Sequence, residues 1–522
     1  MCWELYQFWY FDNNYIIDGI SWIELGNSNF INFVFVGNAI SALILIIMIT
    51  GSFFVVLFVY AEMWDDKEGA NFVILLMLFI AFMAILVISG NLFVFYLGWE
   101  GIGLTSLFLI SFWSERTRAI KATLKVYSIN KIGDFLILVS LLFIFINLGN
   151  TEFIFLNMIA PLLTNYNIQL SNFYLNVIQV IATLLVLGGG VKSAQFGFHI
   201  WLLEAMEAPL GASALMHSST LVVAGVTLVY KLAEFISFST SAHYILTAWG
   251  AWTALFAAFI ACFQYELKII LAYSTISSMG FLYYLLGLGI YTEMLNYLVI
   301  HAYAKIFLFL VVGAIILHCN GCQDIRWMGN LMHYIPSLYI SFVIGSINLA
   351  GLPYWSGYYC KNAIWEYTLK TNYFFGCINI FILLTSVCTN IYLIRTILLV
   401  FTGNKNGHKS IYCYWTTSFS LILVFAIMAL IVNYNGIFWT QYFLTTTNFV
   451  HYSILNYYST FIQILTWISK YNYILLSILY LFIYSGIYIC FLTWHTYKID
   501  ILASLLKRNF ILFILLLLYF FV

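Results

Sequence analysis

Long apolar runs, each near the length of one membrane crossing, alternate with short polar loops along almost the whole chain. A helix needs about 20 apolar residues to cross the hydrocarbon core of a bilayer. The pattern predicts an all-α polytopic membrane protein with about 13 transmembrane helices. The predicted spans are 31–60, 71–90, 91–112, 122–147, 172–203, 211–237, 244–263, 269–290, 294–318, 333–361, 374–401, 413–435 and 472–494.

Two of these runs, 172–203 and 333–361, are interrupted by Gly and polar residues, with Pro also in the second, and each carries a lysine, Lys192 or Lys361. Paired broken helices in two halves of a chain are typical of inverted-repeat transporters with a site near the bilayer midplane. Irregular backbone at that depth lines a wet cavity or is covered by protein. The alternative is a pair of loops between ordinary spans.

The distribution of Lys and Arg among the loops predicts the orientation. Basic residues gather in loops on one side of the predicted membrane, which places that side in the cytoplasm or in the mitochondrial matrix. Residues 1–30 contain no Lys or Arg and are predicted on the opposite side. The basic loops are 61–70, 113–121, 264–268, 319–332, 402–411 and 495–508.

Composition excludes several classes of protein. The chain is 64% apolar and only 8% charged, against about 25% charged residues in a soluble domain. The net charge is zero, which gives no electrostatic reason to expect nucleic acid binding. Nine scattered Cys do not form a disulfide framework, and the single CxxC motif, Cys319 and Cys322, lacks a second pair. We therefore predict no metal site and no nucleotide site.

Ionisable groups inside the predicted spans are the candidate chemistry. Such groups cost several kcal/mol unless they are paired or hydrated, and they mark ion or proton pathways. The alternatives are fixed structural ion pairs and ordinary hydrogen bonds between helices. The candidate proton-pathway residues are Glu100, Asp134, Lys192, His217, Lys231, His301, Lys305 and Lys361.

Two histidines stand in informative local patterns. His217 is followed by the hydroxyl residues Ser218, Ser219 and Thr220, which can support a water chain beside a group that titrates near neutral pH. His301 and Lys305 are four residues apart and therefore share one helix face.

Seven segments, in the same order as in a known family, carry a resemblance that covers about residues 70–400. They are GWEGIGLTSLFLISFW (98–113), KSAQFGFHIWLLEAMEAP (192–209), SALMHSSTLVVAG (213–225), LKIILAYSTISSMG (267–280), HAYAKIFLFL (301–310), CQDIRWMGNL (322–331) and GLPYWSGYYCK (351–361). The chain thereby resembles the chain 5 family of mitochondrial NADH:ubiquinone oxidoreductase, respiratory complex I. That family comprises the distal antiporter-like proton-pumping subunits.

The resemblance implies two inverted five-helix repeats, each with one broken helix. It implies domains over 1–30 (intermembrane-space segment), 31–70 (leading span), 71–237 and 244–401 (antiporter-like halves), 402–494 (C-terminal spans) and 495–522 (truncated lateral or anchor segment). FMN, iron–sulfur clusters and ubiquinone would belong to other subunits, so this chain would carry no redox site of its own. The implied location is the mitochondrial inner membrane, with a mitochondrial gene.

The resemblance also implies roles for particular residues. Glu100 and Lys192 would form the first-half pair, in which the glutamate modulates the pumping lysine. Asp134 would lie at the boundary toward a neighbouring subunit, and His217 would link the first half to the centre. His301 and Lys305 would carry the central axis. Lys361 would be the lysine of the second broken helix, the connection to the outer side. Lys231 belongs to the predicted pathway as an ionisable group inside a span, without a role from the resemblance.

The chain departs from the family at three places. Asn362 stands where the family has Asp, directly after Lys361. Two early spans and the long lateral helix have no counterpart, so we expect a separate polypeptide to supply one or both. The other expected partners are membrane-arm subunits, above all the adjacent antiporter-like chain, together with cardiolipin and other phospholipids.

Two other functions remain open from the sequence. A multi-subunit cation/proton antiporter shares the predicted fold. A scaffold that anchors the arm without pumping is the second alternative, because of Asn362 and the shortened ends.

Overall fold

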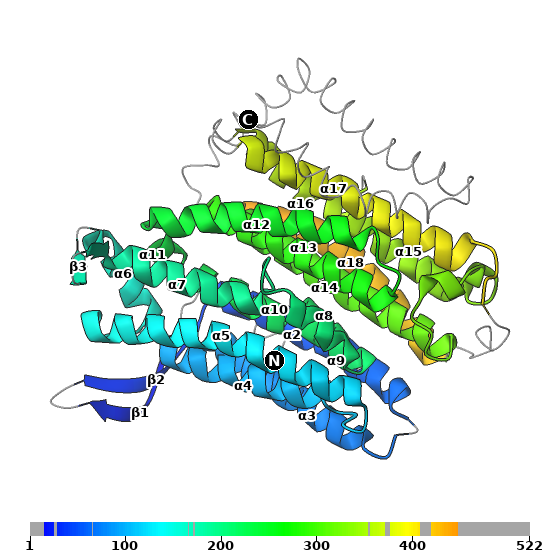
Figure 1. Cartoon of the computed structure of the whole chain (residues 1–522), viewed down its shortest axis with the longest axis horizontal. Helices are drawn as coiled ribbons and strands as arrows, with labels where there is room; N and C mark the ends of the chain where they lie inside the picture. The colour runs from blue at the N-terminus through cyan, green and yellow to red at the C-terminus, as the bar shows by residue number, and fades with distance from the viewer. Residues whose placement is uncertain are drawn as a thin grey trace.

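The computed structural model describes residues 15–25, 29–64, 66–164, 166–170, 173–352, 355–370, 376–407 and 419–446. Long helices lie side by side in a flattened bundle, with the earlier helices against the later ones (Figure 1). The helices before residue 240 are α2 (Ala39–Glu62), α3 (Gly69–Ile88), α4 (Leu92–Ile110), α5 (Thr117–Leu148), α6 (Phe153–Leu163), α7 (Val177–Lys192), α8 (Ile200–Glu204), η1 (Ala205–Glu207), α9 (Leu210–Ser218), α10 (Leu221–Lys231) and α11 (Ala233–Ser237).

The later helices continue the bundle in the same way. They are α12 (Thr240–Ala261), α13 (Leu267–Gly287), α14 (Tyr291–His318), η2 (Ile325–Trp327), η3 (Leu331–His333), α15 (Pro336–Ala350), α16 (Ser356–Lys370), α17 (Gly376–Ile397), η5 (Leu398–Thr402, a π-helical turn) and α18 (Phe419–Thr446). Two units are broken: α7–α8 in the first predicted half (71–237) and α15–α16 in the second (244–401).

Both predicted breaks are present. Between α7 and α8 the backbone turns at Ala194 and Gly197, whose φ angles are 53° and 94°. Helix α15 ends at Gly351, with φ of 76°, a conformation that glycine adopts without steric cost. Each interruption follows small and polar residues, as the sequence indicates.

A third break was not predicted. The run 211–237 was expected to be one span, but α9 ends at Ser218 and α10 begins at Leu221. The hydroxyls of Ser218 and Thr220 bond the carbonyl oxygens of Ala214 and Leu215, at 2.5 and 2.9 Å. Side chains that bond nearby backbone groups compete with regular helix, which explains an interruption at this polar cluster.

The first span begins later than predicted. Residues 31–37 belong to strand β2 (Asn29–Gly37), which pairs antiparallel with β1 (Tyr15–Leu25), and helix α2 starts only at Ala39. Both strands are rich in Ile, Val and aromatic residues, which favour β-structure over helix where a turn separates two short runs. A second hairpin joins β3 (Asn167–Leu170) and β4 (Phe173–Asn176).

Nine helices among the described residues are long and apolar enough to cross a membrane. The shorter apolar helices are α6, the first helix of each broken unit (α7 and α15), and Ser420–Asn433 of α18. The predicted span 472–494 and the segment 495–522 lie outside the described residues, as do the first 14 residues. The count of 13 therefore stays a prediction.

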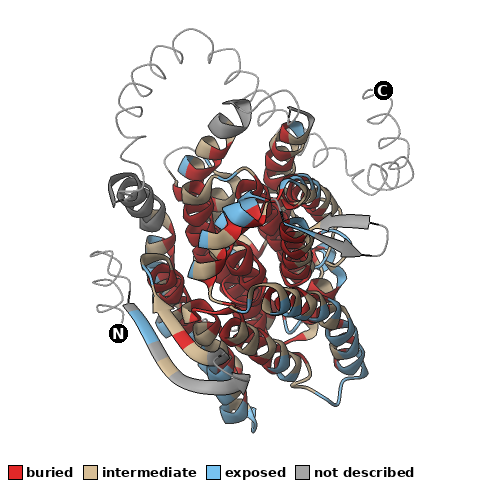
Figure 2. Ribbon diagram, turned by 90° about the vertical axis from the view of Figure 1, so that its left-hand side faces the viewer, coloured by how far each residue is buried: buried red, intermediate tan, exposed pale blue. Residues whose placement is uncertain are grey.

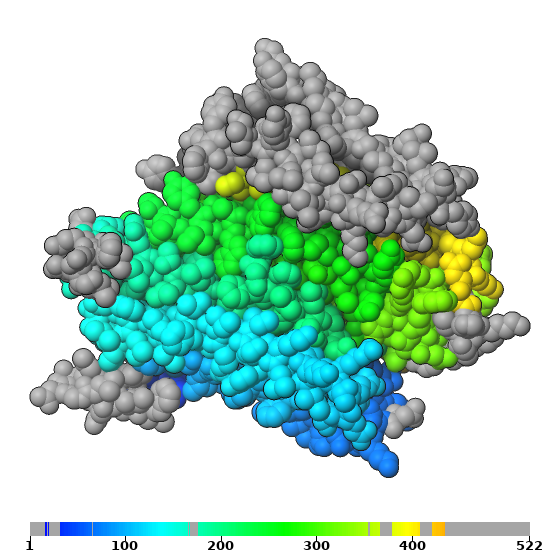
Figure 3. All heavy atoms as spheres, in the orientation of Figure 1, coloured from blue at the N-terminus to red at the C-terminus, as the bar shows by residue number. Residues whose placement is uncertain are grey.

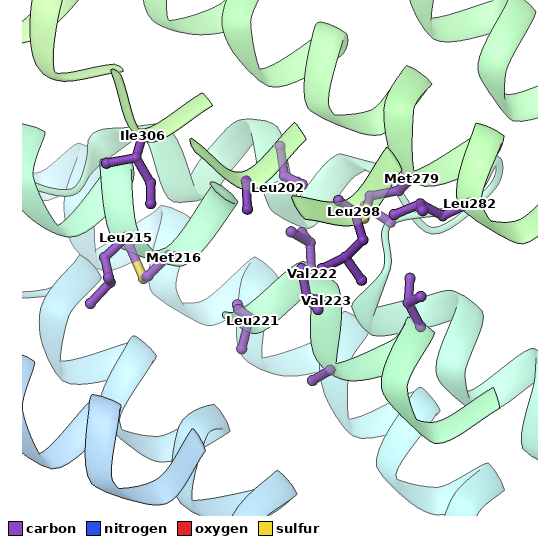
Figure 4. Close-up of a cluster of buried hydrophobic side chains, with 14 of the residues drawn as sticks. Leu202, Leu215, Met216, Leu221, Val222, Val223, Met279, Leu282, Leu298 and Ile306 are labelled. Carbon is purple, nitrogen blue, oxygen red and sulfur yellow. The ribbon is translucent and has the colours of Figure 1, made fainter. Parts of the chain in front are cut away.

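The centre of the bundle is the most buried part (Figure 2). In the 18-residue apolar stretches of α14 and of the α9–α10 unit, 100% of the residues are buried, whereas 33% are buried in that of α3. Leucine, valine and methionine side chains from α8, α9, α10, α13 and α14 fill the space around the α9–α10 break (Figure 4). Figure 3 shows the early helices packed directly against the later ones along their length. The candidate groups on α9 and α14 therefore lie in the interior.

Candidate functional site

The Lys192 ammonium lies at the end of α7 and is fully buried. It donates a hydrogen bond to the carbonyl oxygen of Trp99 on α4. The same ammonium lies 4.1 Å from the centroid of the Trp99 ring, a cation–π geometry. A neutral oxygen and an aromatic face therefore hold the charge of Lys192.

Trp99 connects Lys192 to a nearby pair of carboxylates, Asp134 and Glu100. The Trp99 indole N–H donates to Oδ1 of Asp134 on α5 at 2.7 Å, and Asp134 is 4% exposed. Lys131 bonds both acids, with its Nζ at 2.6 Å from Oε2 of Glu100 and 3.2 Å from Oδ2 of Asp134. Tyr96 donates to the other Glu100 oxygen at 2.7 Å. These residues form a connected circuit of charge beside Lys192.

Glu100 and Lys192, the expected first-half pair, lie in one network but do not bond each other among the described residues. Glu100 has Lys131 as its ion-pair partner, and Lys192 feels both Glu100 and Asp134 through space. The sequence reading gave Lys131 and Trp99 no role. Lys131 stands three residues before Asp134, the spacing of an i,i+3 ion pair on a helix, and this signal could have identified it.

His217 stands at the end of α9, just before the third break. Its imidazole is fully buried, and neither ring nitrogen has a hydrogen-bond partner in the described structure. The Trp201 and Phe309 rings lie 6.5 and 6.3 Å away. The Ser219 hydroxyl is also buried without a partner. Buried polar groups of this kind are normally satisfied by ordered water.

The other end of α9 is held by two charged residues that sequence reasoning did not select. Glu62 at the end of α2 accepts hydrogen bonds from the backbone N–H groups of Leu210 and Gly211, at 2.7 and 2.8 Å. A carboxylate at a helix N-terminus is stabilised by the free N–H groups and the helix dipole. Lys268 was assigned to a basic loop, but it is 6% exposed and donates to the carbonyl oxygens of Met206 and Ala208.

The second half has its own buried bases. His301 and Lys305 on α14 are each 1% exposed. The Lys305 ammonium bonds the hydroxyl of Ser274 on α13. Both nitrogens of His301 are buried without a partner among the described residues. His301 and Lys305 share one face of α14, as the four-residue spacing predicts. Lys305 on that face contacts α13.

Lys361 and Lys231 are both held by backbone oxygens at helix ends. Lys361 on α16 donates to Leu349 O at 2.6 Å and to Ala350 O at 3.4 Å, at the end of α15. Lys231 donates to Ser89 O at 2.7 Å and to Ser89 Oγ at 3.0 Å, just past α3. Carbonyl groups at a helix C-terminus attract cations. The lysines of the predicted pathway are therefore spread along the bundle rather than gathered at one point.

The loop after α14 carries an ion pair outside the spans. Arg326 bonds Asp324, with Nη2 at 2.5 Å from Oδ2. Partial burial raises the pKa of Asp324, but the hydrogen bonds from Arg326 outweigh it and lower that pKa below its usual 3.8. Backbone bridges join this loop to Glu266, so two of the predicted basic loops lie on one side.

Comparisons with known proteins agree with this arrangement. The sequence profile of the NADH:quinone oxidoreductase/Mrp antiporter transmembrane family matches residues 89–389. A solved structure of the Mrp complex from Dietzia sp. DQ12-45-1b has a TM-score of 0.70, with 22% identity, covering 82% of this chain and 46% of that chain. The fold is thus that of the antiporter-like membrane proteins, and the chain belongs to the NADH:quinone oxidoreductase/Mrp antiporter family.

Within that family, two similar relatives carry the name NADH-ubiquinone oxidoreductase chain 5. NADH-ubiquinone oxidoreductase chain 5 of Paramecium tetraurelia is 37% identical over 391 residues, covering 75% of this chain and 68% of the relative. The chain 5 protein of Dictyostelium discoideum is 34% identical over 418 residues, covering 80% of this chain and 62% of the relative. The chain thus spans about two thirds of the length of these relatives.

Proposed function

We propose that this chain is a proton-translocating membrane-arm subunit of an NADH:ubiquinone oxidoreductase. The observation that carries the proposal is the set of lysines buried in spans and held by neutral oxygens. An ammonium held by dipoles needs no fixed counter-ion, so it can lose and regain a proton without leaving a buried carboxylate unpaired. Moving one charge across a membrane costs about 2.3 kcal/mol per 100 mV. A swing of two pKa units supplies about 2.7 kcal/mol.

The proposed path uses the groups in the order of the fold. Protons enter from the basic side, reach Lys192 beside the Glu100–Asp134 circuit, and continue through His217 to His301 and Lys305. Water at the unpartnered imidazoles provides the links. Electron transfer, with its FMN, iron–sulfur clusters and ubiquinone, takes place on other subunits. The proposed location is the mitochondrial inner membrane, where other membrane-arm chains and phospholipids cover the outer faces.

The test replaces Lys192 by Met in the intact complex, with Lys121→Met as the matched control on an exposed lysine. We expect the Lys192 variant to assemble but to lose proton translocation and at least about tenfold of its coupled turnover. Proton uptake per electron in reconstituted vesicles is the measurement. A normal proton-to-electron ratio in the Lys192 variant would contradict the proposal.

The second candidate function is cation/proton antiport. The likeness to the Mrp complex favours it, because it extends over most of this chain. In that case a sodium gradient alone would drive pH changes in vesicles that hold the chain. The redox function predicts that NADH and a quinone are required instead.

A further inference from the structure

Helix α14 carries a line of buried polar residues at four-residue spacing. Glu293, Tyr297, His301 and Lys305 are 8%, 9%, 1% and 1% exposed. Residues four apart on a helix lie one turn above another. With a rise of about 1.5 Å per residue, the line runs for roughly 18 Å along the helix. Of these residues, the sequence reading selected His301 and Lys305.

Contacts connect the members of this line. The Tyr297 ring is stacked on the His301 ring, with centroids 6.4 Å apart and an interplanar angle of 22°. His301 and Lys305 interact electrostatically. At the other end, Asn296 Nδ2 lies 3.5 Å from Oε2 of Glu293. A carboxylate, a phenol, an imidazole and an ammonium therefore follow one another on one helix.

The helix that carries this line packs against the second broken unit. Helix α14, with Glu293 and Tyr297, lies against α16, with Cys360. The next residue is Lys361, whose contacts are neutral oxygens of Leu349, Ala350 and Thr389. The residue after Lys361 is the amide Asn362. The Glu293 carboxylate therefore stands on a helix that packs against this unit, whose residue after Lys361 is an amide.

Glu293 also lies at the end of α14 that faces away from the basic loops. It stands in the first turn of the helix, beside Tyr291, whose ring is 6.0 Å from that of Tyr230 near the end of α10. The basic loop 319–332 follows the opposite end of the same helix. Among the groups of the line, Glu293 is thus the one nearest the outer surface.

We propose that Glu293 is the proton acceptor at the outer end of the second half. Resting on the proposed function, the inference assigns the exit route: a proton passes from Lys305 and His301 along Tyr297 to the Glu293 carboxylate. The protonated acid then releases the proton to water on the outer side.

The first test is Glu293→Gln in the intact complex, with Glu234→Gln as the matched control, an exposed glutamate in the first turn of α11. Glutamine keeps the shape and can still accept from Asn296, so the variant should fold. We expect coupled ubiquinone reduction and proton translocation to fall by about tenfold, as for removal of a positioned proton acceptor. The control and Glu293→Asp should retain both activities.

A rescue experiment separates proton transfer from structure. Glu293→Asp keeps a carboxylate at the same position on α14, so it should rescue the translocation that Glu293→Gln loses. Normal translocation by Glu293→Gln alone would overturn the inference, as would failure of the rescue in a complex that assembles normally. If Lys192→Met also translocates normally, the proposed function fails; if only Glu293→Gln is normal, the exit route alone fails.

Discussion

The two halves of the bundle surround their buried lysines with different chemistry. In the first half, Lys192 lies beside a circuit of two carboxylates and a second ammonium, joined to it through Trp99. In the second half, Lys305 bonds a serine hydroxyl and Lys361 bonds backbone oxygens. One lysine is therefore controlled by nearby charge, and the others by dipoles. The difference shows that a repeated fold does not impose repeated electrostatics.

The difference has a physical consequence for switching. Coulomb energy between charges falls slowly with distance, so moving Lys131 changes the field at Lys192 without any contact between them. Dipoles act only at short range, so Lys305 responds to changes in its own contacts. The first half can therefore be tuned by one half-buried ion pair, Lys131 with Glu100, whereas the second requires a proton to move within the core.

The largest effect is expected from removing the Lys305 charge. Lys305→Met should abolish translocation, while the thermal midpoint of the purified complex stays equal or rises, because an apolar side chain suits this site better than a buried ammonium without an ion-pair partner. Lys405→Met, on an exposed lysine, is the control. A fall of the midpoint together with retained translocation would mean that Lys305 is structural and that the contrast between the halves is wrong.

An intermediate effect is expected from opening the first-half circuit. Asp134→Ala leaves the buried indole N–H of Trp99 without its acceptor, which costs about 1–3 kcal/mol of unfolding free energy. The matched change in the second half, Thr389→Val, removes a 3.4 Å contact to Lys361 and a bond within its own helix to Ser386 O. It leaves no buried donor of another residue without its acceptor and should cost less. Thermal unfolding of both variants in the same detergent gives the comparison. Equal losses would show that the two halves hold their lysines equally firmly.

The smallest effect is expected at the Asp324–Arg326 pair in the loop after α14. Because the pKa of Asp324 is lowered in the folded chain, ionised Asp324 stabilises the fold at pH above its usual 3.8 and loses this contribution as the pH falls further. Arg326 is 59% exposed, so the pair is worth less than about 1 kcal/mol. Asp324→Asn should lower the thermal midpoint slightly at neutral pH but not in acid. A fall of the midpoint that becomes larger in acid would contradict the lowered pKa of Asp324.

The amino-acid sequence by itself determined the membrane class, most of the spans and the two main breaks. Apolar runs of membrane length and Gly-rich or polar interruptions act locally, so they can be read without knowing neighbours. Lys192, His217, Lys305 and Lys361 were recognisable for the same reason, since an ionisable group inside an apolar run is costly wherever the run packs.

Only the tertiary structure decided how these groups are partnered. The pairing of Glu100 with Lys131, the capping of α9 by Glu62 and the burial of Lys268 join segments 31, 148 and 62 residues apart in the chain. The packing of α14, which carries Glu293, against the second broken helix arises in the same way. Periodicity shows which face of a helix a residue occupies, but the energy of a buried charge depends on what other helices bring within a few ångströms. That arrangement appears only when the bundle is assembled.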